Sequence, residues 1–393
     1  MSYRFPYEGL RVLDVSQGFA GPYAGGLLSL YGASVVKVEP PGGDWIREIG
    51  RVYDGITPLG LVANRGKRSI ALDLKTEDGR GIVHRLARDA DIFIESFRPG
   101  VAARLGIDYA AISRINPRVL YLSVSGFGQT GPNTKRPATD TVIQAHSGFM
   151  SVNKGMDGVP HRSGALIADT ATGIYAFQAV AAALYAREKE EAGRHIDVNL
   201  MQGTAAFLAP KIVEHHLEHG EPRSLNAPAG SYRTQDGWIA VTLVKEHHFA
   251  RICRAMGREE LIDDPRFVDF AARGKNEAEL RTLVGDALSK ATTESWVERF
   301  TRHEVLCNAI NGFDDWLADP QVVASTAAPM LNQPGMGPTP VPTIPGTDPA
   351  EGGPDAPSAP AVGEHGRQIL KELGFDNDSI EGLIRDRVVH GIA

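Results

Sequence analysis

The sequence is poor in cysteine, in long apolar runs and in excess positive charge, and each scarcity excludes a class of protein. Cys253 and Cys307 are the only cysteines in 393 residues, too few for a disulfide framework, which favours a reducing, cytoplasmic location. No stretch reaches eighteen consecutive apolar residues and the first residues lack the apolar segment of a signal peptide, so no membrane span is expected. The net charge of −7 argues against nucleic acid as a partner.

Short apolar, β-branched segments alternate with helical segments in the N-terminal half. Strands are expected at LRVLDV, SVVKVE, RSIALDL, DIFIES and RVLYLSVSG, and helices at about residues 22–31, 77–88 and 109–115. Pro22 stands where the first helix is expected to begin, and Gly32 where it ends. This alternation predicts an α/β protein with a doubly wound parallel sheet. The chain is also longer than one core comfortably fills, which favours two domains.

Ligands of doubly wound sheets bind beyond the carboxyl ends of the strands, so the loops that follow the expected strands are the candidate site. These loops are SQGFAGP, EPPGGDW, SFRPG and GFGQTGP. Basic residues gather near the same strand ends and can neutralise phosphate groups, although each taken singly can also be a solvated surface charge. They are Lys67, Arg68, Lys75, Arg98, Arg104, Lys135 and Arg136.

A nicotinamide-dependent oxidoreductase is one alternative, because Glu39 ends the second expected strand, where a ribose-binding acid belongs. The first loop does not support it. Gly18 and Gly21 are followed by Pro22, so the G-x-G-x-x-G pattern that lets the backbone approach a pyrophosphate is missing.

A single acid, Asp169, lies in the otherwise small and apolar stretch GALIADTATG. The residues after it, including Ile174, Phe177, Val180 and Leu184, follow helical spacing, so Asp169 can be an N-cap. It can equally be a reactive carboxylate shielded from water. The residue pattern alone leaves both roles open.

Eight blocks of the sequence, in order, resemble the class III CoA-transferase family, which includes formyl-CoA and carnitine CoA-transferases and the related α-methylacyl-CoA racemases. The blocks are GLRVLDVSQGFAGP, GASVVKVEPPGGD, NRGKRSIALDLK, DIFIESFRPGVAARLGID, INPRVLYLSVSGFGQTGP, ADTATG, GRHIDVNLMQG and GEHGRQILKELGF. The resemblance implies a Rossmann-like large domain, a smaller α+β domain and a homodimer of interlocked chains. The expected organisation is a large CoA-binding domain at 1–200, a helical linker at 201–225, the small domain at 226–328, a Pro- and Gly-rich return linker at 329–360, and C-terminal helices at 361–393 that complete the large domain.

The resemblance also implies a mechanism, in which Asp169 matches the family's catalytic aspartate. CoA moves from an acyl-CoA donor to a carboxylic acid acceptor through an aspartyl anhydride and an aspartyl-CoA thioester. Acyl-CoA and carboxylic acids are then the substrates, and no cofactor is permanently bound. A CoA-binding protein without turnover remains an alternative.

Carried over position by position, the resemblance implies two sets of site residues. The expected CoA contacts are Gln17, Phe19, Leu72, Lys75, Ser96, Phe97, Arg98, Arg104 and Arg136. The expected acyl pocket is lined by Trp45, Arg47, His146, Met150 and Arg162, with Arg47 or Arg162 available to pair a second carboxylate.

Three departures from the family pattern refine these expectations. Ser96 stands where the family commonly has Asn. The stretch NAPAGSYRTQDGW lacks the glycine run of formyl-CoA transferases, which disfavours a formyl or oxalyl substrate. Thr139 stands where the racemases carry a histidine, so a two-base proton exchange lacks one partner unless His146 replaces it.

The rest of the chain indicates organisation more than chemistry. The histidines of EHHLEH, at 214–219, include an i, i+4 pair but have no third ligand of fitting spacing, so no metal site is expected. SYRTQDGWIAVTLV is expected to form a hairpin, residues 333–360 an extended connection, and the C-terminal segment two amphipathic helices.

Overall fold

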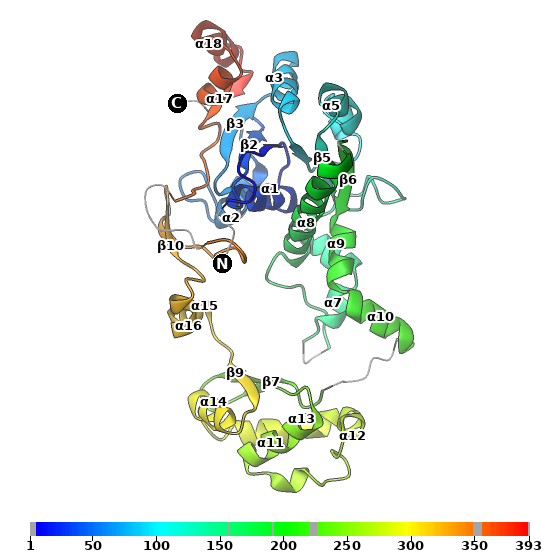
Figure 1. Ribbon diagram of the computed structural model, residues 1–393. Coiled ribbons are helices and arrows are strands. Elements are labelled where there is room, and N and C mark those ends of the chain that lie inside the picture. The colour runs from blue at the N-terminus through cyan, green and yellow to red at the C-terminus, as the bar shows by residue number, and fades with distance from the viewer. Residues whose placement is uncertain (1–4, 156–157, 191, 221–225, 349–355, 392–393) are drawn as a thin grey trace. The chain divides into compact units, whose positions relative to one another are not determined.

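The computed structural model describes residues 5–155, 158–190, 192–220, 226–348 and 356–391, and it divides into two compact units (Figure 1). The large unit joins two separate segments, Met1–Ala209 and Ala324–Ala393, and the small unit is Pro210–Val323. Parts of the two expected linkers, residues 221–225 and 349–355, lie outside the described residues.

The large unit is built on one seven-stranded sheet, which makes the chain an α/β protein as predicted. The strand order is β12-β3-β2-β1-β4-β5-β6, and all neighbours are parallel except β12, which runs antiparallel to β3. Without β12 this is the order of the doubly wound dinucleotide-binding fold. The strands are β1 (Arg11–Asp14), β2 (Ser34–Glu39), β3 (Arg68–Leu72), β4 (Ile92–Glu95), β5 (Leu120–Ser125), β6 (Arg194–Asn199) and β12 (Val389–His390).

Helices cover both faces of this sheet, because side chains that alternate along each strand feed two separate apolar cores. Val12 of β1 belongs to one core and Leu13 to the other. The first core is covered by α1 (Ala20–Leu30), α6 (Asp140–His146), α8 (Ile167–Glu190) and α9 (Leu200–Phe207). The second is covered by α3 (Glu77–Arg88), α4 (Val101–Arg104), α5 (Tyr109–Ile115), α17 (Gly366–Glu372) and α18 (Asn377–Arg385).

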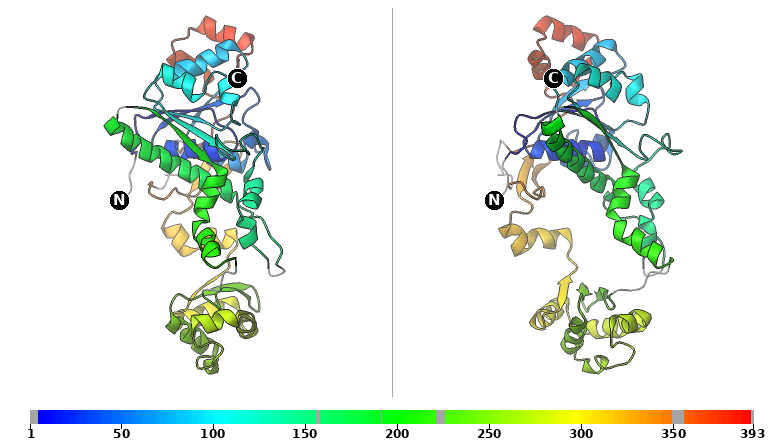
Figure 2. Two further views of the ribbon diagram at one scale, coloured as in Figure 1. Left: turned by 90° about the vertical axis from the view of Figure 1, so that its right-hand side faces the viewer. Right: turned by 45° about the vertical axis from the view of Figure 1, so that its right-hand side comes forward.

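Helix α8, drawn in green in Figure 2, lies along one face of the sheet. In the described part of the chain it is the one helix long and apolar enough to cross a membrane by length and composition. Its buried residues, among them Ala168, Ala176 and Val180, belong to the core of the large unit. Gly173 lets it approach α1 closely, because a Cβ at this position would lie 3.0 Å from the carbonyl oxygen of Ala20. The packing identifies α8 as a core helix of the α/β fold.

Three details differ from the sequence-based expectation. Helix α1 begins at Ala20, and Pro22 occupies its first turn, where a missing N–H leaves no hydrogen bond unmade. The segment expected as a helical linker at 201–225 contains two helices, α9 and α10 (Ala209–Leu217), because Pro210 cannot continue the preceding turn. The Pro- and Gly-rich connection contains an antiparallel ribbon of β10 (Met330–Gln333) and β11 (Gly337–Pro340).

The small unit has its own core beneath a three-stranded antiparallel sheet of order β7-β8-β9. The expected hairpin is present as β7 (Gly230–Arg233) and β8 (Trp238–Thr242). The remaining elements are β9 (Leu306–Ala309), α11 (Glu246–Met256), α12 (Phe270–Lys275), α13 (Glu277–Leu288), α14 (Thr293–Arg302), α15 (Phe313–Ala318) and α16 (Pro320–Ala324). Phe249, Phe267 and Phe300 fill its centre.

The C-terminal segment packs on the β3 edge of the large unit. The amide of His365 donates to the carbonyl of Ser69 over 2.9 Å, and Arg68 forms an ion pair with Glu372 of α17. Val389 of β12 pairs with Leu72. The last residues of the chain therefore complete the sheet that begins at its start.

Candidate active site

A pocket of about 370 Å³ opens beyond the carboxyl ends of β1, β4 and β5 in the large unit. The chain leaves β1 toward β2 on one side and continues from β4 to β5 on the other, so the loops after β1 and β4 diverge and leave a crevice. The lining residues are Gln17, Phe19, Ala20, Gly21, Trp45, Ser96, Phe97, Arg98, Pro99, Val124, Ser125, Gly126, Thr134, Arg136, Ala138, Thr139, Asp169 and Leu200.

The loops after β1 and β4 are tied together by Ser96. Its Oγ accepts from the amide of Gln17 over 2.8 Å and donates to the carbonyl of Gln17 over 2.9 Å. Gly21 faces the same junction, since a Cβ there would lie 2.7 Å from Cβ of Ser16. The departure from Asn to Ser therefore places a short hydroxyl that holds the two loops, and this hydroxyl is already engaged by protein backbone.

A buried charge network under the loop after β1 fixes that loop from below. Nζ of Lys67 lies 2.7 Å from Oδ2 of Asp14, and Nζ of Lys37 lies 2.9 Å from Oδ2 of Asp44. Burial opposes ionisation of Asp14, but Lys67 and Lys37 hold its pKa below the ordinary value, while burial lowers the pKa of Lys67 to about 8. Asp44 also accepts from the amide of Gly18, and Lys37 donates to the carbonyl of Ser16. These pairs connect strand residues directly to the pocket wall.

The nicotinamide interpretation is wrong at Glu39. Both of its carboxylate oxygens are held by Arg47, each at 2.7 Å, and Oε1 also accepts from Ser69. Burial opposes ionisation here, yet these bonds hold the pKa of Glu39 below its usual range. Because Glu39 is buried and fully engaged, its side chain is not available to a ribose. The same geometry removes Arg47 from the expected acyl pocket, since its guanidinium is buried against Glu39.

Asp169 lies in the first turn of α8, with its side chain at the pocket. It is not the helix N-cap, because α8 begins at Ile167 and the amides of Ala168 and Asp169 both donate to Asp140 of α6. The capping interpretation of Asp169 is therefore wrong. Burial, together with the nearby negative charge of Asp140, raises the pKa of Asp169 to about 7. Asp169 is thus a carboxyl group that changes its charge near neutral pH.

Two arginines give the pocket positive charge. Arg98 follows β4 and Arg136 lies in the loop after β5, and both line the pocket. Neither forms an ion pair with a described residue, and Arg136 stacks over Phe127 with 5.6 Å between guanidinium carbon and ring centroid. An anionic ligand at this rim would therefore meet cations that no carboxylate among the described residues neutralises.

The structure brings many of the expected site residues to one pocket and leaves the others elsewhere. Gln17, Phe19, Trp45, Ser96, Phe97, Arg98, Arg136 and Asp169 line it. Leu72 is fully buried in the core, and Lys75 and Arg104 are exposed outside the pocket lining. His146 packs against Phe127, Met150 lies in α7 (Phe149–Val152), and Arg162 is exposed ahead of α8. The roles assigned to these residues stay predictions.

Sequence reasoning missed the side chains that hold Asp169. Asp140 and Gln144 are both buried, and both bond to the segment that leads into α8. Their i, i+4 spacing in a helix was a readable signal of a bonded pair. Nothing in the sequence indicated which distant amides they bind.

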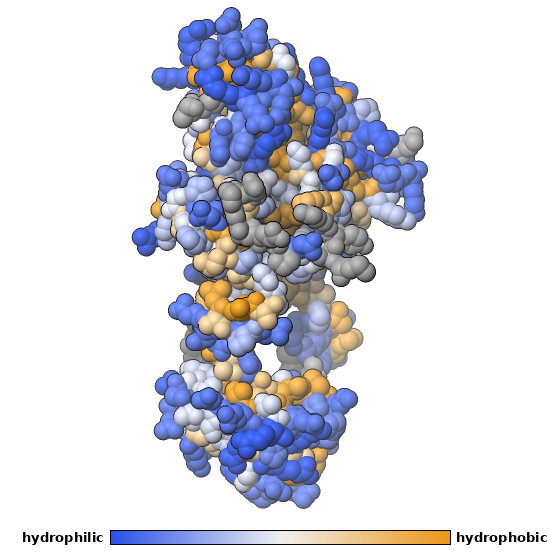
Figure 3. All heavy atoms as spheres, turned by 60° about the vertical axis from the view of Figure 1, so that its left-hand side comes forward, coloured by the Kyte–Doolittle hydropathy of each residue, from blue (hydrophilic) through white to orange (hydrophobic). Residues whose placement is uncertain are grey.

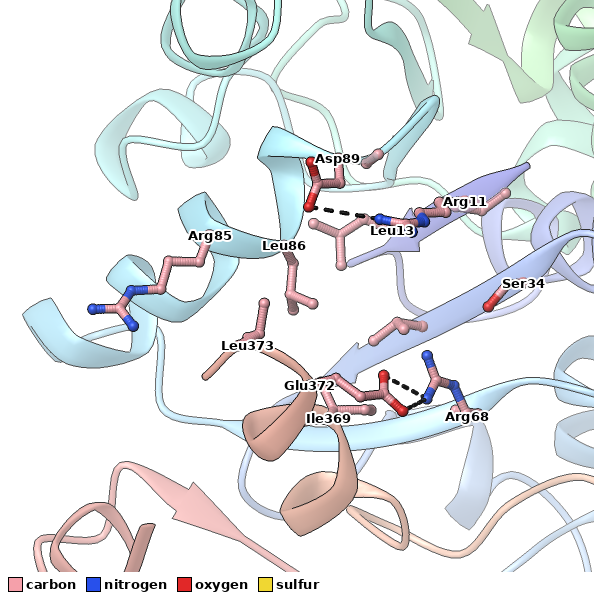
Figure 4. Close-up of a pocket in the computed structure, with 13 residues that line it drawn as sticks. Arg11, Leu13, Ser34, Arg68, Arg85, Leu86, Asp89, Ile369, Glu372 and Leu373 are labelled. Carbon is pink, nitrogen blue, oxygen red and sulfur yellow. Dashed lines mark hydrogen bonds and ion pairs between the residues drawn. The ribbon is translucent and has the colours of Figure 1, made fainter. Parts of the chain in front are cut away.

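A second hollow, of about 410 Å³, lies at the amino ends of β1, β2 and β3 between α3 and α17 (Figure 4). Arg11 and Arg68 reach across it to Asp89 and Glu372, at 3.6 and 2.7 Å. Arg85 stacks over Phe375 instead. Both acids in this hollow are thus paired with arginines, whereas no arginine pairs with Asp169 in the first pocket.

Within the described residues, no group of three or more His, Cys, Asp or Glu side chains is placed to hold a metal ion. The site consists of a carboxyl group that titrates near neutrality, two unpaired arginines and a crevice at the point where the strand order reverses. These features are typical of an α/β enzyme whose pocket can accept an anionic ligand next to a candidate carboxylate nucleophile.

Comparison with known proteins specifies the class. The model of CoA-transferase family III matches residues 7–366. The chain is 36% identical over 379 residues to an acetyl-CoA:oxalate CoA-transferase of Acetobacter aceti, covering 94% of this chain and 96% of the relative. It is 34% identical over 388 residues to a succinate–glutarate CoA-transferase of Agrobacterium fabrum, covering 94% and 96%. The crystal structure of a CAIB/BAIF family protein from Brucella suis matches with a TM-score of 0.81 at 31% identity, covering 94% of this chain and 100% of that one.

The chain belongs to CoA-transferase family III. It is a CoA-transferase, and its substrates are CoA thioesters and carboxylic acids.

Proposed function

We propose that this enzyme transfers CoA between two carboxylic acids with Asp169 as the covalent nucleophile. The observation that carries the proposal is the position of Asp169: a partly exposed carboxylate, in the pocket, in the first turn of a core helix. The amide dipoles of that turn favour its ionised form, while burial restrains it, so the group is reactive without being permanently charged.

The reaction proceeds by exchange of acyl bonds. A carboxylate oxygen of Asp169 attacks the thioester carbon of the donor, the C–S bond breaks, and an aspartyl anhydride and CoA thiolate form. The thiolate then attacks the aspartyl carbonyl, which releases the donor acid and leaves an aspartyl-CoA thioester. The acceptor carboxylate attacks this thioester and expels the thiolate, which finally attacks the acceptor's carbonyl and regenerates Asp169. No net proton, electron or water is consumed.

The pocket lining suits this chemistry. Water would hydrolyse an anhydride, and Phe19, Phe97 and Leu200 place apolar surface around Asp169. Arg98 and Arg136 supply positive charge for the phosphates of CoA. Lys75, Arg104 and the backbone around Leu72 remain proposed contacts for parts of CoA beyond this pocket.

The two acids can be identified by assaying a panel of acyl-CoA donors and carboxylic acid acceptors. The relatives named above act on acetyl-CoA and oxalate, and on succinate and glutarate, which makes small dicarboxylic acids the first candidates for this chain. Arg162 is the residue we propose for pairing a second carboxylate, since Arg47 is held by Glu39. Equal activity with monocarboxylates would remove this assignment.

Racemase activity is the second candidate, and one observation weighs against it. Thr139, at the position where the racemases carry a histidine, lines the pocket and cannot exchange a proton near neutral pH. His146, the possible replacement, packs against Phe127 and is not part of the lining.

We further propose that two chains form the interlocked homodimer of the family. Apolar side chains are exposed on α8, α9 and α10, among them Tyr185 at 68%, Phe207 at 50%, Val213 at 56% and Leu217 at 69%. On the side of the molecule that Figure 3 brings forward, which is the left-hand side of Figure 1, apolar side chains also gather in patches among hydrophilic ones. Such exposure is more than a monomer usually carries. Light scattering coupled to gel filtration should give twice the mass of one chain, and a monomer would contradict the proposal.

The first experiment traps the covalent intermediate. Protein is mixed with acetyl-, succinyl-, glutaryl- or oxalyl-CoA, quenched with hydroxylamine, and digested for mass spectrometry. A hydroxamate at Asp169 with one donor supports the mechanism and names the donor. Asp169→Asn should give none, and Asp108→Asn, which alters the capping residue of α5, should be labelled as the wild type is. CoA binding without any adduct would reject the nucleophile and favour a non-catalytic protein.

A further inference from the structure

A directional chain of hydrogen bonds from α6 holds the segment that carries Asp169. The amide of Ser163 donates to Oε1 of Gln144 over 2.8 Å, and Nε2 of Gln144 donates to Oδ1 of Asp140. Oδ2 of Asp140 then accepts from the amides of Ala168 and Asp169, at 2.8 and 3.1 Å. Both ends of the turn before α8 are thus fixed by two buried side chains of one helix.

The direction of these bonds determines which side chains can make them. Every donor in the chain is an amide N–H, so position 140 must accept from three N–H groups, and a carboxylate is the side chain that offers acceptors only. An Asn at 140 would turn an NH₂ group toward Nε2 of Gln144. Reversing the Gln144 amide would then set its NH₂ group against the amide of Ser163. Asp140 and Gln144 are 4% and 0% exposed, so water cannot repair either mismatch.

We propose that Asp140 and Gln144 are positioning residues of the transfer reaction, an inference that rests on the proposed role of Asp169. The two side chains fix the turn at 163–169, and Asp140 holds a negative charge beside the nucleophile. The pair acts through Asp169 and does not itself line the pocket. The negative charge of Asp140 disfavours a second negative charge beside it, so the Asp169 carboxylate is a stronger base than an ordinary aspartate.

Among the charged groups around Asp169, Asp140 has the largest effect on its pKa. Helix α9 carries no ionisable residue, and Tyr121 of β5 and His195 and Asp197 of β6 lie on the face of the sheet that holds Glu95. The other ionisable residue of β6, Arg194, pairs with Glu190 at the far end of α8. The remaining groups on the elements around Asp169 are Tyr23 on α1, His146 on α6, and Arg98 and Arg136 in the pocket lining. After burial, Asp140 is the cause that raises the pKa of Asp169.

The test exchanges the two side chains. Asp140→Asn alone breaks the donor pattern. The double variant Asp140→Asn with Gln144→Glu restores it, because the Asn NH₂ group donates to the new carboxylate, which still accepts from Ser163. The net charge is unchanged, but the charge now lies on the side chain that binds Ser163. Asp376→Asn, at the N-cap of α18, is the matched control for replacing a capping carboxylate by an amide.

Two readouts follow each variant. One is the rate of hydroxamate formation at Asp169 with succinyl-CoA. The other is the divergence pH, defined as the pH at which the difference in melting temperature between that variant with and without Asp169→Asn reaches its full size, because this limit is set by the pKa of Asp169 in the folded state. The second readout reports ionisation of Asp169 without any turnover. We expect Asp140→Asn to slow trapping about 100-fold, as a misplaced reacting group does, and the double variant to recover to within about 10-fold. Both should move the divergence pH about one unit lower, because loss of the Asp140 charge lowers the folded-state pKa of Asp169.

Each outcome decides between the possibilities. A double variant that is folded but as slow as Asp140→Asn, or a divergence pH that equals that of Asp376→Asn, would overturn the positioning role. If Asp140→Asn does not fold, the double variant alone still gives both readouts. If the wild type forms no adduct with any donor, the proposed function fails, while the divergence pH still tests the Asp140–Asp169 coupling independently.

Discussion

The two hollows of the large unit lie at opposite edges of the parallel sheet, and they differ in how their acidic residues are paired. At the amino ends, Arg11 and Arg68 each reach an acid across the hollow (Figure 4). At the carboxyl ends, Arg98 and Arg136 pair with no described acid, although Asp169 lines the same pocket. The volumes, about 410 and 370 Å³, are nearly equal. Size therefore does not distinguish the two hollows. They differ in their acids, because Asp89 and Glu372 are paired with arginines whereas Asp169 is not.

The carboxylates of the two hollows also differ in protonation. Arg68 holds the pKa of Glu372 below its usual range, while burial and Asp140 raise that of Asp169 to about 7. A carboxylate that is paired stabilises the fold, and one that is isolated is available for chemistry. The predictions below test this contrast.

The largest effect is expected from removing the nucleophile. Asp169→Asn should lower transfer from succinyl-CoA by at least about 1,000-fold, because the amide cannot form the anhydride. Asp89→Asn, which breaks an ion pair in the other hollow, should change the rate by less than about twofold. Steady-state assays of both variants decide the point, and a fully active Asp169→Asn would remove the distinction between the hollows.

The second-largest effect is expected from lowering the pH, which should protonate Asp169 before it protonates Glu372. Attack requires ionised Asp169, so trapping should level off above pH 7 and fall about tenfold per unit below it. The stability effect has the opposite sign. With a raised folded-state pKa, ionisation of Asp169 destabilises the fold as pH rises from about 4 to 7, so Asp169→Asn should be more stable than wild type at pH 8 and equal to it near pH 4. Denaturant titrations at the two pH values measure this, and equal stability at pH 8 would contradict it.

Loss of the pocket arginines should weaken CoA binding. Arg98→Ala and Arg136→Ala are each expected to raise the Kd for CoA about tenfold, since each removes a charge-assisted contact. Arg11→Ala is the control from the amino-end hollow and should leave the Kd unchanged. Calorimetric titration with CoA compares the three, and an equal loss in all of them would show only a general effect of net charge.

The smallest effect is expected at the edge of the sheet. Arg68→Ala should cost less than about 1 kcal/mol of unfolding free energy, because its pair with Glu372 is partly exposed. The lowered pKa of Glu372 means that this contribution is present near pH 7 and is lost as pH falls below about 4. Urea unfolding at pH 7 and pH 3.5 tests the sign. If Arg68→Ala lost activity without losing stability, Arg68 would have a role in the reaction and the contrast between the two hollows would fail.

Much of the fold was predictable because its signals are local. Apolar runs fixed the positions of β1 to β5, and the loops after β1, β4 and β5 were predicted as the binding edge from the alternation of elements alone. Helix α3 was predicted at its observed bounds, since Thr76 caps it and Arg88 ends it. Asp169 was singled out by its isolation among small residues, although its role came from the family resemblance.

What could not be predicted depends on contacts between distant residues. Ser96 binds the backbone of Gln17, 79 residues away, and Asp140 caps a helix 28 residues later. Arg47 pairs with Glu39 because the short 3₁₀ helix at Trp45–Glu48 turns back toward β2. This pairing removes Arg47 from the expected acyl pocket and Glu39 from a ribose site. Strand β12 has two residues, too few for any periodicity to be read.

That short strand has a consequence for biosynthesis. Because β12 pairs with β3, the ribosome must add more than 300 residues after β3 before this edge of the sheet acquires its partner. The small unit is one continuous segment and emerges before the second part of the large unit, so we expect it to fold first. During that interval the nascent sheet exposes the unpaired backbone groups of β3, the kind of surface that recruits neighbouring chains or chaperones. Pairing with β12 covers those groups, so we expect the nascent chain to associate most readily before Val389 has left the ribosome.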